Sequence, residues 1–158
     1  KTSYDADQPQ FVIDVPVGTA IIPLALKGVM ETEAGTLTEM IFSVSQTLCG
    51  VGSSTPVTPV NARVQASGTG PTSVCSVYSL YTGNCTAPSG GYEFARFSSP
   101  FVLSDGDPLN DVRMQWKADD EGWSPLIEGG GSLVVHIDGT TTAPTGYFTA
   151  VWWEFEVN

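Results

Sequence analysis

Apolar and polar side chains alternate with a period of two wherever the chain shows a regular pattern. Between residues 112 and 117, Val112, Met114 and Trp116 occupy one register, and charged or amide side chains occupy the other. This period is typical of β-strands, because successive side chains of a strand point to opposite faces of the sheet. Clusters of Gly, Pro, Asn and Asp interrupt the pattern at short intervals and indicate turns. The alternation predicts strands at residues 11–15, 20–31, 37–46, 74–81, 92–97, 101–103, 112–117, 132–138 and 147–157, and we expect one short strand near residues 60–66 inside a long surface connection.

About eight or nine strands of this kind, with no amphipathic helix, indicate an all-β protein, an antiparallel two-sheet β-sandwich. The long polar connection at residues 47–70 favours Greek-key or jelly-roll topology. The chain has 158 residues, of which 41% are hydrophobic, and this is enough apolar material for one core. We therefore expect a single jelly-roll domain over residues 11–158, preceded by a flexible or partner-bound N-terminal arm at residues 1–10.

The first two strands carry specific expectations. In residues 11–15, Phe11, Ile13 and Val15 share one register, whereas Val12 and Asp14 share the other. We expect the second register to form a polar outer side, as is common in antiparallel sheets. In residues 20–31, proline at position 23 removes one backbone donor, which predicts an edge position or a bulge there.

The last strand, at residues 147–157, carries aromatic side chains on both registers. One register holds Tyr147, Val151, Trp153, Phe155 and Val157, and the other holds Phe148, Trp152, Glu154 and Glu156. We expect Trp153 and Phe155 to anchor the core, where each would bury about 150–250 Å². The remaining apolar side chains exceed what one sandwich core requires, and this surplus indicates a subunit interface.

Charge excludes one class of partner. The 6 Lys and Arg residues against 17 Asp and Glu give a net charge of −11. Proteins bind nucleic acid electrostatically through clustered cations, so we expect no direct nucleic-acid contact. Every apolar stretch is too short to span a bilayer, so we expect no membrane segment.

The three cysteines match no zinc spacing. Either Cys49, Cys75 and Cys85 are three buried thiols, or Cys75 and Cys85 form a disulfide across a hairpin-like segment. The disulfide would place the protein in an oxidising compartment or on the surface of an extracellular particle.

Oxygen-bearing side chains cluster in the loop at residues 104–111. Calcium prefers such ligands, which makes Asp105, Asp107, Asn110 and Asp111 a candidate calcium site. The spacing differs from that of an EF-hand, and turn-forming Asp and Asn are also expected in any β-protein loop. Calcium is the only cofactor that the sequence suggests.

Catalytic groups are scarce. The single histidine, His136, occurs without a recognisable nucleophile motif, so we do not expect an enzyme. Among the aromatic residues, Trp123, Trp152 and Phe148 are candidates for contact with a ligand such as carbohydrate or with another subunit. The alternative is that these side chains belong to the core.

Two stretches of the chain resemble a known class of proteins. The opening FVIDVPVGTAIIPLALKGVMETEAGTLTEMIFSVSQ and the closing GGGSLVVHIDGTTTAPTGYFTAVWWEFEVN are similar in style to virion structural proteins with a jelly-roll or tumour-necrosis-factor-like sandwich. The resemblance implies a VPVGT turn between the first two strands and a central, aromatic-rich last strand. Many RNA-packaging jelly rolls carry a basic N-terminal arm, whereas KTSYDADQPQ has one Lys and two Asp. This difference points to a surface or shell-building role.

We therefore expect a structural virion protein, a capsid or capsid-decorating subunit. It would form a homo-oligomer, a trimer first and a pentamer second, and contact other capsid proteins. The alternative is a secreted, extracellular β-sandwich module that binds carbohydrate or a receptor.

Overall fold

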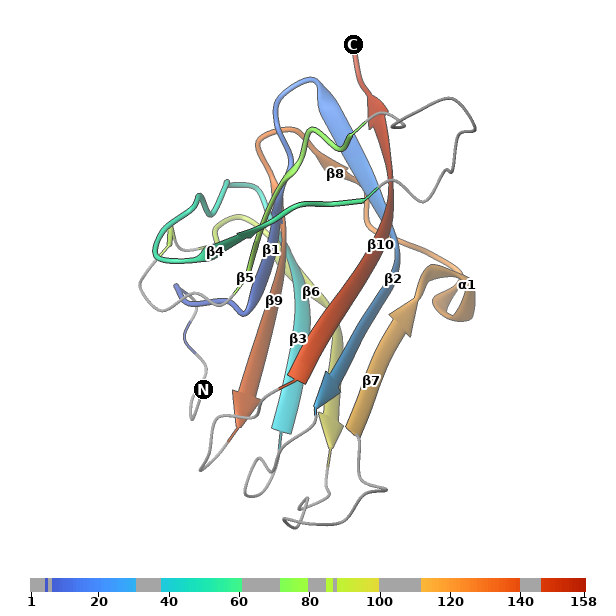
Figure 1. The fold of residues 1–158 in the computed structure, drawn as a ribbon. Coiled ribbons are helices and arrows are strands. Elements are labelled where there is room, and N and C mark those ends of the chain that lie inside the picture. The colour runs from blue at the N-terminus through green and yellow to red at the C-terminus, as the bar shows by residue number, and fades with distance from the viewer. Residues whose placement is uncertain are drawn as a thin grey trace.

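The computed structural model describes residues 5, 7–30, 38–60, 72–79, 85–86, 88–99, 112–139 and 146–158. Two antiparallel sheets pack face to face, so the predicted all-β sandwich is confirmed (Figure 1). The strands are β1 (Phe11–Asp14), β2 (Thr19–Met30), β3 (Thr38–Ser45), β4 (Thr55–Val57), β5 (Ser76–Ser79), β6 (Tyr92–Ser99), β7 (Val112–Lys117), β8 (Ile127–Glu128), β9 (Ser132–Gly139) and β10 (Gly146–Glu156). A short helix, α1 (Ala118–Glu121), follows β7.

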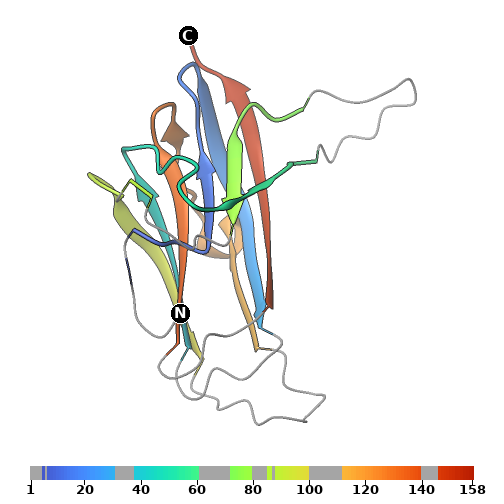
Figure 2. The same cartoon turned by 60° about the vertical axis from the view of Figure 1, so that its left-hand side comes forward.

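The strand order joins segments that are distant in the sequence. The six-stranded sheet has the order β4-β5-β1-β9-β3-β6. The four-stranded sheet has the order β10-β2-β7, and β8 pairs with the beginning of β2. Figure 2 shows β10, β2 and β7 on one side of the sandwich and β9, β3 and β6 on the other. Strand β10 is therefore an edge strand of its sheet in the described part of the chain.

The main core lies between the two sheets and takes side chains from both. Phe42 on β3 and Trp116 on β7 are among its largest fully buried members. Phe94 on β6 packs its ring edge-on against Trp116, with ring centroids 5.2 Å apart. Met114 and Trp116 are buried while Arg113 is exposed, as the alternation in this strand predicts.

Strand β2 contains the irregularity that Pro23 predicts, but it is not an edge strand. On β10, Val151 pairs with Ala25 and the next residue, Trp152, pairs with Pro23, so Leu24 is left out of the ladder. A bulge of this kind shifts the alternation by one residue. Ile21 and Leu26 consequently both face the core although they are five positions apart.

The outer side of β1 is not polar and solvated, contrary to our expectation. All four residues of β1 are buried, Asp14 included. The residues after β3 fold over this side of the six-stranded sheet, where Cys49 packs with Val12 and Val134. Tyr78 and Cys85 pack against the same group, which we call the outer cluster.

Asp14 holds this covering segment in place. Its Oδ1 accepts hydrogen bonds from the backbone N–H of Cys49 (3.0 Å) and from the hydroxyl of Ser132 (2.6 Å). Its Oδ2 accepts a hydrogen bond from the N–H of Gly50 (2.7 Å). The Ser132 hydroxyl also lies 2.8 Å from the carbonyl oxygen of Thr47. A buried carboxylate satisfied in this way fastens the segment to β1 and β9.

The described residues before β1 are attached to the domain. The N–H of Gln10 donates to the carbonyl of Val135 at 2.9 Å, extending the pairing of β1 with β9. The carbonyl of Asp7 accepts a hydrogen bond from the N–H of Cys85 at 2.8 Å, and Pro9 is buried. Residues 7–10 therefore pack on the domain, whereas residues 1–4 and 6 of the expected arm lie outside the described residues.

Candidate functional site

The outer face of β10 carries a row of exposed apolar side chains. Tyr147, Val151, Trp153 and Phe155 expose 51%, 45%, 64% and 40% of their surface, and we call them the β10 stripe. Alternation places all four on one side of the strand. The expected burial of Trp153 and Phe155 is therefore wrong, because β10 presents its other register to the core.

The inward register of β10 holds Phe148, Ala150 and Trp152, which pack against the main core. The ring of Phe148 lies 4.7 Å from that of Phe11 and 6.1 Å from that of Phe42, measured between centroids. Gly28 lies directly opposite Phe148 on β2, and the missing side chain leaves room there for Phe148 and Met40. The aromatic ring of Phe148 thus fits the interior and leaves the β10 stripe outside.

Strand β2 extends the apolar surface beside the stripe. Ile22 pairs with Trp153, and Ala25 pairs with Val151. Directly opposed residues of antiparallel strands lie on the same face, so these side chains adjoin the stripe. Exposed apolar side chains gathered on one sheet face are typical of an interaction site.

A row of cations lies next to the apolar surface. On β2 and β7, Lys27 pairs with Gln115, Lys117 with Ala25, and Arg113 with Val29, which places all three cations on the outer face. We call Lys27, Arg113 and Lys117 the basic row. It contains half of the six Lys and Arg residues of a chain whose net charge is −11. None of the three forms an ion pair with a carboxylate among the residues that the structure describes.

Glu154 joins the edge of β10 to the other sheet. Its Oε1 accepts from the N–H of Val74 (2.8 Å), and its Oε2 accepts from the Ser73 hydroxyl (2.5 Å) and the Trp152 Nε1–H (3.2 Å). Burial opposes ionisation of Glu154, but these hydrogen bonds outweigh it and lower the pKa of the carboxyl below its usual value. The ionised group therefore fixes both Trp152 and the chain that leads into β5.

Replacement of Glu154 by glutamine is expected to lower stability by about 1–2 kcal/mol at neutral pH, because hydrogen bonds to an ionised acceptor are lost. The folded-state pKa is lowered, so this contribution is present above the ordinary pKa of glutamate and is lost as pH falls through the folded value. Urea unfolding at neutral and acid pH measures the difference. The exposed Glu156 on the same strand supplies the control, Glu156→Gln. Equal losses for E154Q and E156Q at neutral pH would contradict the assigned role.

The predicted contact residues do not form one site. Trp123, which exposes 46% of its surface, follows α1 and packs its ring against Phe94 at 6.3 Å. Phe148 and Trp152 face the core from β10. The sequence pattern did not identify the β10 stripe as the outer surface, although the aromatic residues on both registers indicated that one set would remain outside.

The cysteines are also arranged differently from the predicted pair. All three are free thiols. Cys75 belongs to the main core, whereas Cys85 packs in the outer cluster beside Cys49, on the opposite face of the six-stranded sheet. The structure therefore does not bring Cys75 and Cys85 together.

The candidate calcium ligands Asp105, Asp107, Asn110 and Asp111 lie outside the described residues. Within the described part of the chain, no group of three or more His, Cys, Asp or Glu side chains could hold a metal ion. In the same part, no helix is long and apolar enough to cross a membrane.

A hollow of about 440 Å³ lies at one end of the sandwich, between β3, β6 and β8. Gln46, Tyr92 and Glu128 are among its lining residues. Glu128 is the one carboxylate among the described residues that line it, and His136 is buried elsewhere on β9. The hollow thus lacks a described pair of groups for acid–base chemistry.

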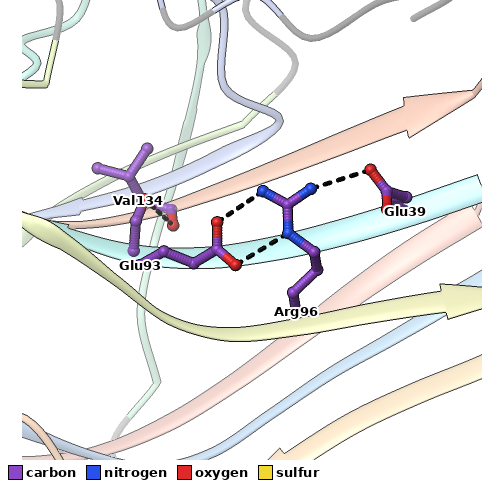
Figure 3. A network of polar contacts seen from close by, with 5 residues as sticks. Glu39, Glu93, Arg96 and Val134 are labelled. Atoms are coloured by element: carbon purple, nitrogen blue, oxygen red, sulfur yellow. Dashed lines mark hydrogen bonds and ion pairs between the residues drawn. The ribbon is translucent and has the colours of Figure 1, made fainter.

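The outer face of β3 and β6 differs from that of β10, because its arginine, Arg96, is paired with glutamates of the same face. Arg96 bonds to Glu93 through Nε (2.9 Å) and Nη2 (2.7 Å), and to Glu39 through Nη1 (3.0 Å) (Figure 3). The hydrogen bond from Arg96 lowers the pKa of Glu93. The charge of Arg96 is therefore already paired and is not available to a partner protein.

Replacement of Arg96 by alanine is expected to change stability by less than about 1 kcal/mol, because the pairs are exposed and screened. The contribution through Glu93 is present above the ordinary pKa of glutamate and is lost as pH falls through its lowered value. A double-mutant cycle on Arg96 and Glu93 at low and high salt measures it. A coupling energy well above about 1 kcal/mol that does not change between low and high salt would show that the network is structurally essential.

Comparisons of the sequence with protein-family models, curated proteins and solved structures give no match. The function is therefore inferred from the residues and geometry of this chain.

Proposed function

We propose that this protein is a structural subunit of a virus particle, capsid or capsid-attached, that assembles with copies of itself through the outer face of β10, β2 and β7. The observation that carries the proposal is the β10 stripe, in which Tyr147, Val151, Trp153 and Phe155 are exposed along one strand. Large aromatic side chains are enriched in protein interfaces, where they contribute most of the binding energy. A second copy of this chain is the partner that the proposal assigns.

The basic row supports an acidic partner, such as a second copy of this chain. A protein with a net charge of −11 presents a mainly acidic surface to its neighbours. Lys27, Arg113 and Lys117 give one face the opposite sign, and complementary charges steer association and fix its orientation. The exposed acidic residues of α1, Asp119 and Glu121 among them, offer one such partner surface on the next copy.

The same charges favour a ring over a two-fold dimer. A two-fold contact of this face with itself would set one basic row near another, which is unfavourable. A head-to-tail contact sets the basic row against an acidic surface, and it closes into a ring when the rotation permits. We therefore propose cyclic assembly, with a trimer as the first choice and a pentamer as the second, and contacts to other capsid proteins.

Jelly-roll topology is part of the proposal. The pairing of β2 with β10 is nested around that of β3 with β9, so early strands pair with late strands in order. A long hairpin rolled into two sheets produces nested pairs of this type. This nesting supports the jelly roll, and a stable all-β subunit of this type suits a shell.

Light scattering coupled to size exclusion tests the assembly. We expect the mass of a trimer or pentamer, dissociating only on strong dilution. Runs with a calcium chelator distinguish two modes of assembly. Assembly through the sheet face should be unaffected by the chelator, whereas assembly that needs metal in the loop at residues 104–111 should be lost. A monomer at every concentration, or failure to co-sediment with particles from the producing culture, contradicts the proposal.

A second candidate function is binding of carbohydrate by a secreted module. The observation that favours it is the exposure of Trp153 and Tyr147 on one sheet face, since sugars stack on exposed aromatic rings. Titration of glycans with tryptophan fluorescence as the readout distinguishes the two functions. A saturable change that Trp153→Ser removes supports the binding module, whereas a shell subunit shows none.

A further inference from the structure

Two cysteines that lie 36 positions apart in the chain meet in the outer cluster. Cys49 is buried there, and Cys85 is half-buried against it. Cys85 packs against the group that Cys49 forms with Val12 and Val134. The Cys85 thiol in turn lies 3.3 Å from the carbonyl oxygen of Thr86, to which it donates.

The backbones of the two segments are joined as well. The N–H of Thr86 donates to the carbonyl of Cys49 at 3.0 Å, so the residue after Cys85 is hydrogen-bonded to Cys49. On the other side, the N–H of Cys85 donates to Asp7. The segments of Cys49 and Cys85 are therefore held side by side while the two side chains pack in one cluster, and a disulfide requires such closeness.

Cys75 is excluded from this pairing by the sheet itself. Cys75 shares its register with Val77, and both side chains belong to the main core. Tyr78, on the other register of β5, belongs to the outer cluster with Cys85. The six-stranded sheet therefore separates the thiol of Cys75 from that of Cys85.

We propose that Cys49 and Cys85 form an intramolecular disulfide bond when the protein meets a small-molecule disulfide such as oxidised glutathione. A thiolate of the protein attacks the small disulfide, forms a mixed disulfide and releases one small thiolate, which takes up a proton. The second protein thiolate then attacks the protein sulfur of the mixed disulfide and releases the other. The protein loses two electrons and two protons, which together are two hydrogens, and the small disulfide is reduced to two thiols.

The position of Cys49 favours the bond. Asp14 holds the backbone of Cys49 and Gly50 against β1, so Cys49 is fixed before oxidation. Burial raises the pKa of both thiols, and for Cys49 the nearby Cys85 and Asp14 raise it further. Because the thiolate is the reactive form, we expect faster oxidation at mildly alkaline pH.

Oxidation with oxidised glutathione at about pH 8.5 tests the pairing. Mass spectrometry of the intact wild-type protein should show the loss of two hydrogens, and proteolytic mapping should recover one peptide that links Cys49 to Cys85. One thiol, that of Cys75, should remain reactive after unfolding. A link that includes Cys75, a bond between two chains, or three thiols that remain after prolonged oxidation overturns the proposal.

Thermal unfolding provides a second readout. Oxidation should raise the Tm of the wild-type protein and of Cys75→Ser by roughly 10 °C, because the crosslink restricts the unfolded chain. The same treatment should leave the Tm of Cys49→Ser and Cys85→Ser unchanged. The mapping uses the wild-type chain, so it decides the matter even if one variant fails to fold.

Discussion

Replacement of Asp14 by alanine is expected to destabilise the domain by about 3 kcal/mol or more, because a buried acceptor of three hydrogen bonds is removed. The N–H groups of Cys49 and Gly50 and the hydroxyl of Ser132 would lose this acceptor. A loss of this size is a large share of the stability of a typical domain, about 5–15 kcal/mol. Urea unfolding measures it. Amide exchange at Gly50 should report the release of the covering segment.

Asp14→Asn is the matched control. Asparagine keeps one oxygen that can accept from Cys49 and Ser132, but its amide group cannot accept from Gly50. We expect a smaller loss, of about 1–2 kcal/mol, with faster exchange mainly at Gly50. If D14A cost less than about 1 kcal/mol, the covering segment would be held by other contacts and the assigned role of Asp14 would be wrong.

Replacement of Trp153 by serine is expected to weaken self-association by roughly 30- to 1,000-fold, the effect of losing an aromatic hot spot of about 2–4 kcal/mol. Trp153 is the most exposed member of the β10 stripe, so the folded subunit should keep its stability within about 0.5 kcal/mol. Sedimentation equilibrium gives the association constant, and urea unfolding of the dissociated subunit gives its stability.

Tyr92→Ser is the matched control for association. Tyr92 exposes 54% of its surface but lies on β6, in the other sheet. It should leave association unchanged. If W153S and Y92S weakened association equally, or if neither did, the β10 stripe would not be the contact surface.

The sequence predicts the strands well where one register is clearly polar. In β7, Arg113, Gln115 and Lys117 alternate with apolar side chains, and the structure has the same strand with the same inward face. Such a strand can be oriented from its own residues, because burying its charged side would be costly. The bulge in β2 was also predictable, since proline cannot donate to the ladder.

The orientation of β10 and the burial of β1 could not be predicted in the same way. Both registers of β10 are apolar, and its inward face depends on Gly28 across the ladder, which leaves room for Phe148. Asp14 is buried because residues far along the chain fold over it. The short strands β4 and β8 and the single-turn helix α1 contain too few residues to show a period.

The residues of the candidate site were likewise only partly predictable from the sequence. The sequence indicated a surplus of apolar side chains in the last strand, but the side chains outside are Trp153 and Phe155 rather than Trp152 and Phe148. Of the two alternatives for the cysteines, the structure does not fit a bond between Cys75 and Cys85, which are ten positions apart in the chain but lie on opposite faces of a sheet. Nearness in sequence says little about pairing across a sandwich.

Hydroxyl-radical footprinting of the native protein tests the central claim most directly, because it compares two tryptophans of one molecule. In a single subunit Trp153 is more exposed than Trp123, at 64% against 46%. If the outer face of β10 is covered by a second copy, Trp153 should be labelled less than Trp123, and the order should reverse once the assembly is dissociated. Stronger labelling of Trp153 than of Trp123 in the native protein would show that this face is open to solvent.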